Sequence, residues 1–183
     1  MHSEAYLSFI IDCVEAGDRL APFDQLIAAW WVGIKEGGSA IGQHRTIPLP
    51  DRIRAAHLFN LNLDLYSATA LHLFARRPKE MLETGWAVPL RLVTAALFEV
   101  ENIGRDDARL ILERLVKRVA LSAQEAQELN RLQRLAEPAE IPDTATAFLD
   151  ELRIPLLQGR QSGWAAYADA RVPLGDMQAR LQW

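Results

Sequence analysis

The chain has 183 residues, 50% of them hydrophobic and 24% charged, which is typical of a globular protein and excludes a disordered or fibrous one. Its formal net charge is −4, and neither half of the sequence forms a charged tail. Such a chain has no general attraction for nucleic acid or anionic lipid. We expect one domain over residues 1–183, since a chain of this length buries most of its apolar surface.

Cysteine usage and hydropathy indicate the compartment. Cys13 is the single cysteine, which excludes an intramolecular disulfide and a cysteine-based metal site. The first residues are acidic rather than basic, unlike a secretory signal, and no run of 18 apolar residues occurs. We therefore expect a cytoplasmic protein without a membrane span. Arginine supplies 17 of the 20 basic residues, a bias that we attribute to a GC-rich bacterial genome.

Helix signals dominate the first sixty residues. The segment SEAYLSFIIDCVEAG predicts a helix that begins at Ser3 and stops at Gly17. Residues 23–36 place Phe23, Ile27 and Trp30 in one sector of a helical wheel, and Gly37 ends that helix. A further helix is predicted from Asp51.

Residues 60–76 are ambiguous between strand and helix. Asn60, Asn62 and Asp64 alternate with leucines, which is the period of a half-buried strand. The only strand partner that the pattern suggests is PLRLVT at 89–94, and an isolated hairpin is marginal in stability. We therefore predict a helix over 63–76 with a break at 60–62.

The second half of the sequence also predicts helices. One opens at Pro78 and ends at Gly85, and another runs from Pro89 to Gly104. Residues 106–120 form the best amphipathic helix, with these residues in one sector: Ala108, Ile111, Leu112, Leu115, Val116 and Val119. Ser122 and Glu125 form a capping box for the next helix, and Asp143 caps the one after it. The predicted fold is all-α: an irregular single-domain bundle of about eight to ten short helices.

The glycine content of one stretch raises the possibility of a phosphate loop: AWWVGIKEGGSAIGQHRTIPLPDRIR at 29–54. A P-loop requires lysine where Ser39 stands. A dinucleotide loop requires a second glycine at that same residue, and a strand rather than a helix before it. The stretch is therefore interpreted as a connector between helices. It leaves His44 and Arg45 as candidate binding residues, because loops on rigid scaffolds often carry them.

No cofactor, metal or catalytic motif is predicted. The four histidines show no HExxH, ExxH or HxxxH spacing, and no GxSxG elbow is present. If residues 51–76 formed one helix, His57, Asn60, Asp64 and Ser67 would share a polar face suited to a metal or to acid–base chemistry. The simpler interpretation is a solvent-exposed face.

Arginines and tryptophans supply the remaining candidate binding residues. An anion-binding surface would need several arginines to converge, although single arginines usually only solubilise a face. Trp31 and Trp183 are harder to bury than the other aromatic residues, and exposed aromatic residues anchor protein interfaces. The candidate set is His44, Arg45, Arg52, Arg54, Arg76, Arg77, Trp31 and Trp183.

The sequence favours a non-enzymatic protein-interaction module of bacterial type: an adaptor, a chaperone, an inhibitor or immunity-like protein, or a subunit of a larger complex. The expected partner is another protein, with an anionic ligand as a further option and nucleic acid disfavoured by the acidic charge. The alternative is an enzyme that handles a small molecule or nucleotide, or a ligand-binding domain. Its pocket would lie between helices and would be lined by His57, Asp64 and His72.

Overall fold

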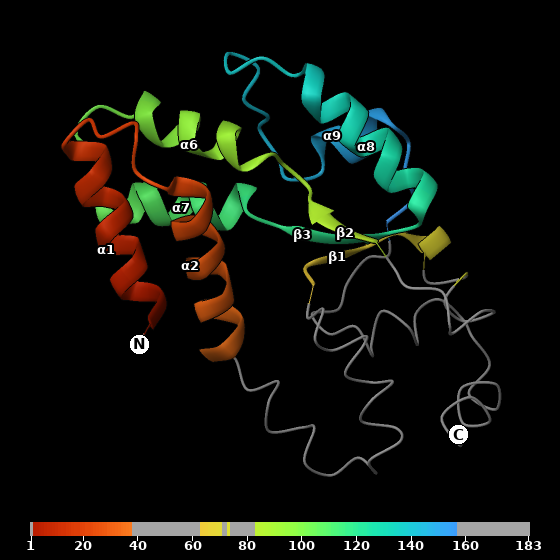
Figure 1. Cartoon of the computed structure of the whole chain (residues 1–183), viewed down its shortest axis with the longest axis horizontal. Coiled ribbons are helices and arrows are strands. Elements are labelled where there is room, and N and C mark those ends of the chain that lie inside the picture. The colour runs from red at the N-terminus through yellow and green to blue at the C-terminus, as the bar shows by residue number, and fades with distance from the viewer. Residues whose placement is uncertain (1, 38–62, 71–72, 74–82, 157–183) are drawn as a thin grey trace, which may run out of the picture. The chain divides into compact units, whose positions relative to one another are not determined.

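The computed structural model describes residues 2–37, 63–70, 73 and 83–156 (Figure 1). Six helices and three strands have their bounds in this part of the chain. The helices are α1 His2–Glu15, α2 Phe23–Gly37, α6 Leu90–Glu99, α7 Arg105–Leu115, α8 Ala123–Leu135 and α9 Ala147–Glu151. The strands are β1 Leu65–Tyr66, β2 Glu83–Trp86 and β3 Arg118–Leu121. Helical residues also follow β1, at 68–70 and at 73.

The fold is mixed, so the all-α prediction is wrong. About 59% of the described part is helical, and three strands form a small mixed sheet in the order β1-β3-β2. Each strand lies where a helix was predicted. Residues 83–86 are extended instead of ending a helix, and α7 ends at Leu115 instead of residue 120.

Parallel pairing between β1 and β3 explains two of these errors. Leu65 pairs with Val119 and Tyr66 with Ala120, and the amide of Asp64 extends the ladder by donating to the carbonyl of Arg118 at 3.0 Å. The alternation at 60–65 did indicate a strand, but its partner lies more than fifty residues further along the chain. The expected partner, PLRLVT, belongs instead to helix α6.

The run of apolar residues in β3 is a further reason why this strand was predicted as helix. Val119, Ala120 and Leu121 are all buried, as is typical of a strand in a parallel pair. Val116 and Val119 also continue the apolar sector of α7, so the helical period and the buried strand gave the same pattern. Sheet pairing, rather than local propensity, therefore decides where α7 ends.

The described helices and strands belong to two compact units, each built from three separate stretches of the chain. The first contains residues 1–38, 86–117 and 131–148, and the second contains 39–85, 118–130 and 149–183. In the first unit α1 packs along α2, and both contact other helices: α1 contacts α7, and α2 contacts α6 (Figure 1). The largest buried side chains of this unit include Leu7, Ile10, Ile27, Leu92, Leu97, Leu112 and Leu115. No helix among the described residues is long and apolar enough to cross a membrane.

Two helices end in the same hydrogen-bonded turn. At the end of α1, Gly17 has φ +67°, its amide donates to the carbonyl of Val14, and the amide of Asp18 donates to that of Cys13. This is the Schellman arrangement, which favours glycine because the left-handed backbone carries no Cβ penalty there. The predicted stop at Gly17 is therefore confirmed.

The second turn of this kind follows α9 and has an arginine in the left-handed position. Arg153 has φ +55°, its amide donates to the carbonyl of Asp150, and that of Ile154 donates to Leu149. Leu149 and Ile154 are both buried, which supplies the apolar contact that usually accompanies this turn.

Polar side chains fix the end of α8 in the first unit. The guanidinium of Arg91 donates to the carbonyl oxygens of Gln133 at 2.6 Å and Ala136 at 2.7 Å. The side-chain amide of Gln133 donates to the carbonyls of Trp86 and Ala87 at 2.8 and 3.0 Å. A cation at the last carbonyls of a helix complements its dipole, so these bonds cap α8 and join it to the start of α6.

Replacement of Leu115 by alanine should lower the free energy of unfolding by about 2–5 kcal/mol, because its side chain is fully buried and truncation leaves a cavity. Leu110 lies on the same helix but is 63% exposed, and Leu110→Ala should cost less than about 1 kcal/mol. Urea denaturation of both variants measures the difference. Equal losses would contradict this helix phase.

Candidate interaction surface

Of the eight candidate binding residues, Trp31 is the one that falls within the described residues. It is buried, at 7% exposure, and its ring meets that of Trp86 edge to face, with centroids 5.7 Å apart and an interplanar angle of 87°. Trp31 therefore belongs to the core of the first unit and is not an exposed anchor. The other candidates lie outside the described residues: His44, Arg45, Arg52, Arg54, Arg76, Arg77 and Trp183.

The polar face proposed for residues 57–67 is not formed by Asp64 and Ser67. Asp64 lies beside the sheet, where its carboxylate accepts the backbone N–H of Arg118 at 2.8 Å. Arg118 also donates from its guanidinium to the hydroxyl of Thr84 at 2.8 Å. Asp64 therefore helps to align β1 with β3, while His57 and His72 lie outside the described residues.

Ser67, Ser122 and Glu125 form a buried polar cluster in the second unit. The hydroxyl of Ser67 lies 2.7 Å from both carboxylate oxygens of Glu125. The same carboxylate accepts the amide and the hydroxyl of Ser122, each at 2.9 Å. The predicted capping box of Ser122 and Glu125 is thus confirmed, and Ser67 is an additional member that the sequence did not suggest.

The cluster caps two helices. The Ser67 hydroxyl accepts the amide of Ala70 at 3.3 Å, which caps the helical residues after β1. Ser122 caps α8 in the same way, by accepting the amide of Glu125 at 3.3 Å. A serine hydroxyl hydrogen-bonded to a carboxylate could be a nucleophile with its base. The Ser67 side chain, however, is fully buried. Its contacts are those of a structural cap.

Tyr66, next to Ser67, is also buried and polar. Its hydroxyl oxygen accepts the backbone N–H of Leu63 at 3.2 Å. Burial disfavours the phenolate and raises the pKa of Tyr66 to about 12. The phenol is therefore neutral at physiological pH and serves as a fixed acceptor at the start of β1.

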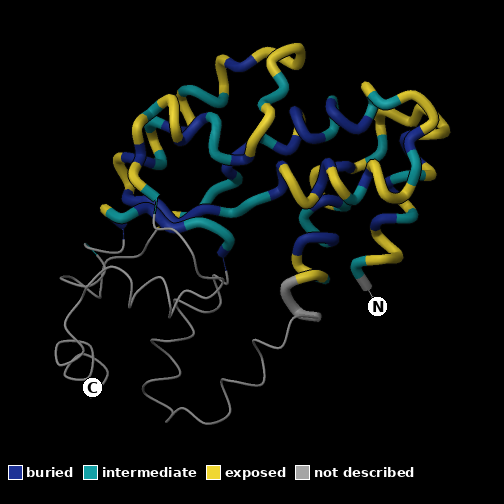
Figure 2. The backbone as a smooth tube through the Cα atoms, turned by 180° about the vertical axis from the view of Figure 1, so that it is seen from behind, coloured by how far each residue is buried: buried dark blue, intermediate teal, exposed yellow. Residues whose placement is uncertain are grey.

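Helix α1 presents apolar side chains on two sides. Leu7 and Ile10 are fully buried, whereas Tyr6 is 37% and Phe9 51% exposed. Buried and exposed residues alternate along the helix that follows the N-terminus (Figure 2). At 100° per residue, the exposed residues Ala5, Tyr6, Phe9 and Asp12 fall within an arc of about 120°. These four residues are called the outer face of α1. A helix that is apolar around most of its circumference is usually covered on more than one side.

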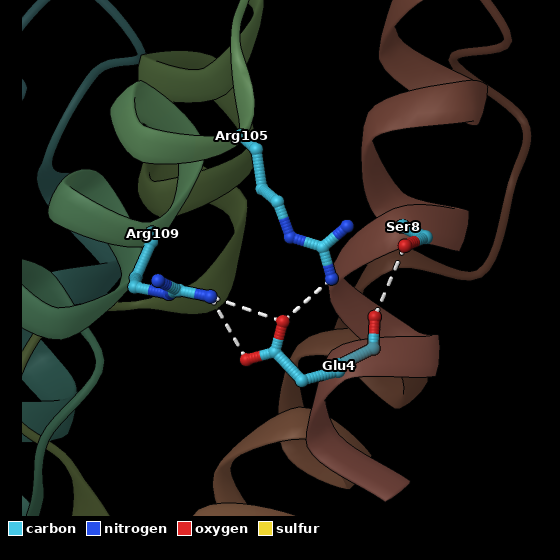
Figure 3. A network of polar contacts seen from close by, with 4 residues as sticks. All are labelled: Glu4, Ser8, Arg105 and Arg109. Atoms are coloured by element: carbon cyan, nitrogen blue, oxygen red, sulfur yellow. Dashed lines mark hydrogen bonds and ion pairs between the residues drawn. The ribbon is translucent and has the colours of Figure 1, made fainter. Parts of the chain in front are cut away.

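An ion-pair network fixes the side of α1 that meets α7 (Figure 3). The carboxylate of Glu4 accepts the guanidinium of Arg105 at 2.5 Å and that of Arg109 at 2.9 Å. The hydrogen bond from Arg105 is the main cause that lowers the pKa of Glu4. On the helical wheel Glu4 and the outer face lie on opposite sides of the buried stripe, so the network and the outer face occupy different sides of α1.

A close helix crossing fixes the side of α1 that meets α2. A Cβ placed on Gly33 would lie 2.9 Å from the backbone nitrogen of Ser3 and 3.1 Å from its Cα. Only glycine allows the backbones to approach this closely. The crossing therefore sets the separation of α1 from α2 near the start of the outer face.

The chain beside the outer face is acidic. Residues 12–24 contain four acids and one arginine, a net charge of −3, and all five are exposed: Asp12, Glu15, Asp18, Arg19 and Asp24. The guanidinium carbon of Arg19 lies 4.8 Å from the ring centroid of Phe98, within the range of a cation–π contact. In the described part of the chain, no group of three His, Cys, Asp or Glu residues is placed to hold a metal ion.

Sequence reasoning missed the outer face, although a signal for it exists. The run AYLSFIIDCV places apolar residues around about two thirds of the helix circumference. One packed stripe does not need this many apolar residues, so the excess indicated a second contact side.

Gly33→Ala should destabilise the protein, although alanine normally favours a helix by about 1 kcal/mol over glycine. The new methyl group would meet the backbone of Ser3, which cannot move aside as a flexible side chain can. We expect a net loss of about 1–3 kcal/mol in urea denaturation. Gly85→Ala is the control, because a Cβ there meets nothing within 4 Å. A more stable Gly33→Ala variant would show that the helices are further apart.

Ser67→Ala should cost about 1–3 kcal/mol of unfolding free energy, because it removes a hydrogen bond from a buried carboxylate. Ser8→Ala is the matched control. The Ser8 hydroxyl donates only to the carbonyl of Glu4 in its own helix, at 3.1 Å, and its loss should change stability by less than about 0.5 kcal/mol. Equal effects in thermal denaturation would contradict the capping role.

Comparison of the chain with protein-family models, curated proteins and solved structures found no match to any of them.

Proposed function

We propose that this chain is a non-enzymatic protein-interaction module of bacterial type, an adaptor, a chaperone, an inhibitor or a subunit of a larger complex, and that the outer face of α1 contacts its partner. The observation that supports this most strongly is the pair Tyr6 and Phe9, two aromatic side chains 37% and 51% exposed on a fixed helix. They lie three residues apart, so they are neighbours on the helix surface. Aromatic residues are enriched among the residues that dominate binding at interfaces.

The rigidity of α1 adds to this support. One side of the helix is fixed by Gly33 and Ser3, and another by Glu4 with two arginines. A partner would therefore lose little conformational entropy in ordering this face. Pre-organised aromatic residues cost less on binding than residues of a flexible segment.

Single exposed apolar residues are common and need no explanation. Leu20 at 96% and Leu135 at 73% exposure are of this kind, since neither has a large aromatic neighbour in its own segment. Val32 and Ile34, 42% and 40% exposed on α2, are aliphatic, whereas Tyr6 and Phe9 are aromatic neighbours on one helix surface. We further propose that the partner is a protein and that this chain acts in the cytoplasm.

The proposal predicts that recovery of a partner depends on Tyr6 and Phe9. The tagged full chain, its Tyr6→Ser/Phe9→Ser double variant and a Leu110→Ser control would be purified from the cells that encode it, and co-purifying proteins quantified by mass spectrometry. Leu110 is a suitable control because it is an exposed apolar residue on α7. At least one protein should fall about tenfold with the double variant, which corresponds to about 1.4 kcal/mol of binding energy, and stay constant with the control.

Urea denaturation would show that the double variant is folded, because exposed substitutions usually change stability by no more than about 0.5 kcal/mol each. The same set of proteins at the same levels from all three chains would refute the outer face as a contact surface.

A further inference from the structure

The charges at the C-terminal end of α1 run against its helix dipole, whereas Glu4 in the first turn agrees with it. The N-terminal end of a helix favours acids and the C-terminal end favours bases. Helices α7 and α8 follow this rule, with Asp106 and Asp107 or Glu125 in the first turn and Arg114 or Arg134 in the last. Helix α1 has no basic residue in its last turn, and the same is true of α6 and α9. The last turn of α1 instead contains Asp12 and Glu15.

The acidic charge continues past the end of α1. Asp18 follows the glycine turn and is exposed, and Asp24 lies in the first turn of α2. Asp18 is partly used in the turn, since its carboxylate accepts the amide of Leu20 at 3.1 Å. Asp12 lies within the outer face and Glu15 lies about 60° further around the helix. With the partial negative charge of the helix end, these carboxylates produce a region of negative potential at the C-terminal end of α1.

Resting on the function proposed above, we infer that the partner presents a basic amphipathic helix to α1. Its apolar residues would cover Tyr6 and Phe9, and its lysines or arginines would lie beside Asp12, Glu15 and Asp18. Charge complementarity selects this partner, because a basic segment relieves the repulsion among the acids and a neutral one does not. An anionic membrane surface would instead be repelled.

The shape of the outer face supports a helical partner. Ala5, Phe9 and Asp12 follow the four- and three-residue spacing of a helix stripe, with Tyr6 beside it. Fourteen residues give α1 a length of about 21 Å. A helix laid along this stripe would contact it through residues at the same spacing, as packed helices do.

The test uses the full chain and a fluorescent synthetic peptide of about 18 residues, made of leucine and lysine with leucines at helical spacing. A twin peptide has glutamate in place of lysine. Fluorescence anisotropy would measure the dissociation constants at about 50 and about 300 mM NaCl. The lysine peptide should bind at least about tenfold more tightly than its twin, and more weakly at the higher salt concentration.

Four variants of the chain separate the contributions. Phe9→Ser and Asp12→Asn/Glu15→Gln should each weaken binding of the lysine peptide by about tenfold. The double variant should also make the dissociation constant less dependent on salt concentration. Leu110→Ser and Glu113→Gln are the controls, because both residues are exposed on α7. They should leave the dissociation constant within about twofold.

The outcomes distinguish this inference from the function on which it rests. Equal binding of the lysine peptide by all variants would show that it binds non-specifically and would overturn the inference. Loss with Phe9→Ser but not with Asp12→Asn/Glu15→Gln would leave an apolar contact surface and refute a basic partner. If neither peptide binds while a cellular protein is lost with Tyr6→Ser/Phe9→Ser, the interaction function stands and the partner class is wrong.

Discussion

The approach of α1 to α2 at Gly33 determines the geometry of the first unit. Because Gly33 has no side chain, the backbone of Ser3 lies where any other residue would place a Cβ. The start of α1 is thereby fixed against the end of α2, and its opposite end is fixed by the turn at Gly17. Between these points the helix buries Leu7 and Ile10. The positions of the Glu4 network and of the exposed aromatic residues follow from this packing.

An exposed aromatic side chain carries a solvation cost that stability alone does not justify. In α1 this cost coincides with a second one, the acids at the negative end of the helix. Local rules are expected to fail mainly at functional sites, where stability is exchanged for binding. Two such failures on the same helix are therefore more informative than either alone. They support the proposal that the interaction is made through α1.

Sequence reasoning located the helices whose limits depend on local signals. Three such signals coincide with helix boundaries in the structure: Gly17, Pro89 and the capping box of Ser122 and Glu125. Each depends only on residues close to it in the sequence. The strands depend on distant segments and are only two and four residues long. A periodic pattern cannot identify a strand of two residues.

In the candidate site, too, the features that depend on distant residues could not be predicted from the sequence. Trp31 was expected to be exposed because it lies at the edge of the apolar sector of its helix, and Trp86, more than fifty residues away, covers it. The predicted helix that begins at Ser3 did not single out Tyr6 or Phe9. Which apolar side of α1 is covered depends on tertiary packing, which the sequence of α1 does not contain.

The parallel pair in the second unit has an entropic consequence. Its two residue pairs close a segment of more than fifty residues, and the entropy lost in closing such a loop grows with the logarithm of its length. The bonds from Ser67 to Glu125 join the ends of the same two strands by a second route. They also favour this register: a slip of one residue would turn Ser67 to the opposite face of the strand and remove one of the donors to a buried carboxylate. A sheet too short to define its own alignment thus has it reinforced by two acidic side chains, Glu125 and Asp64.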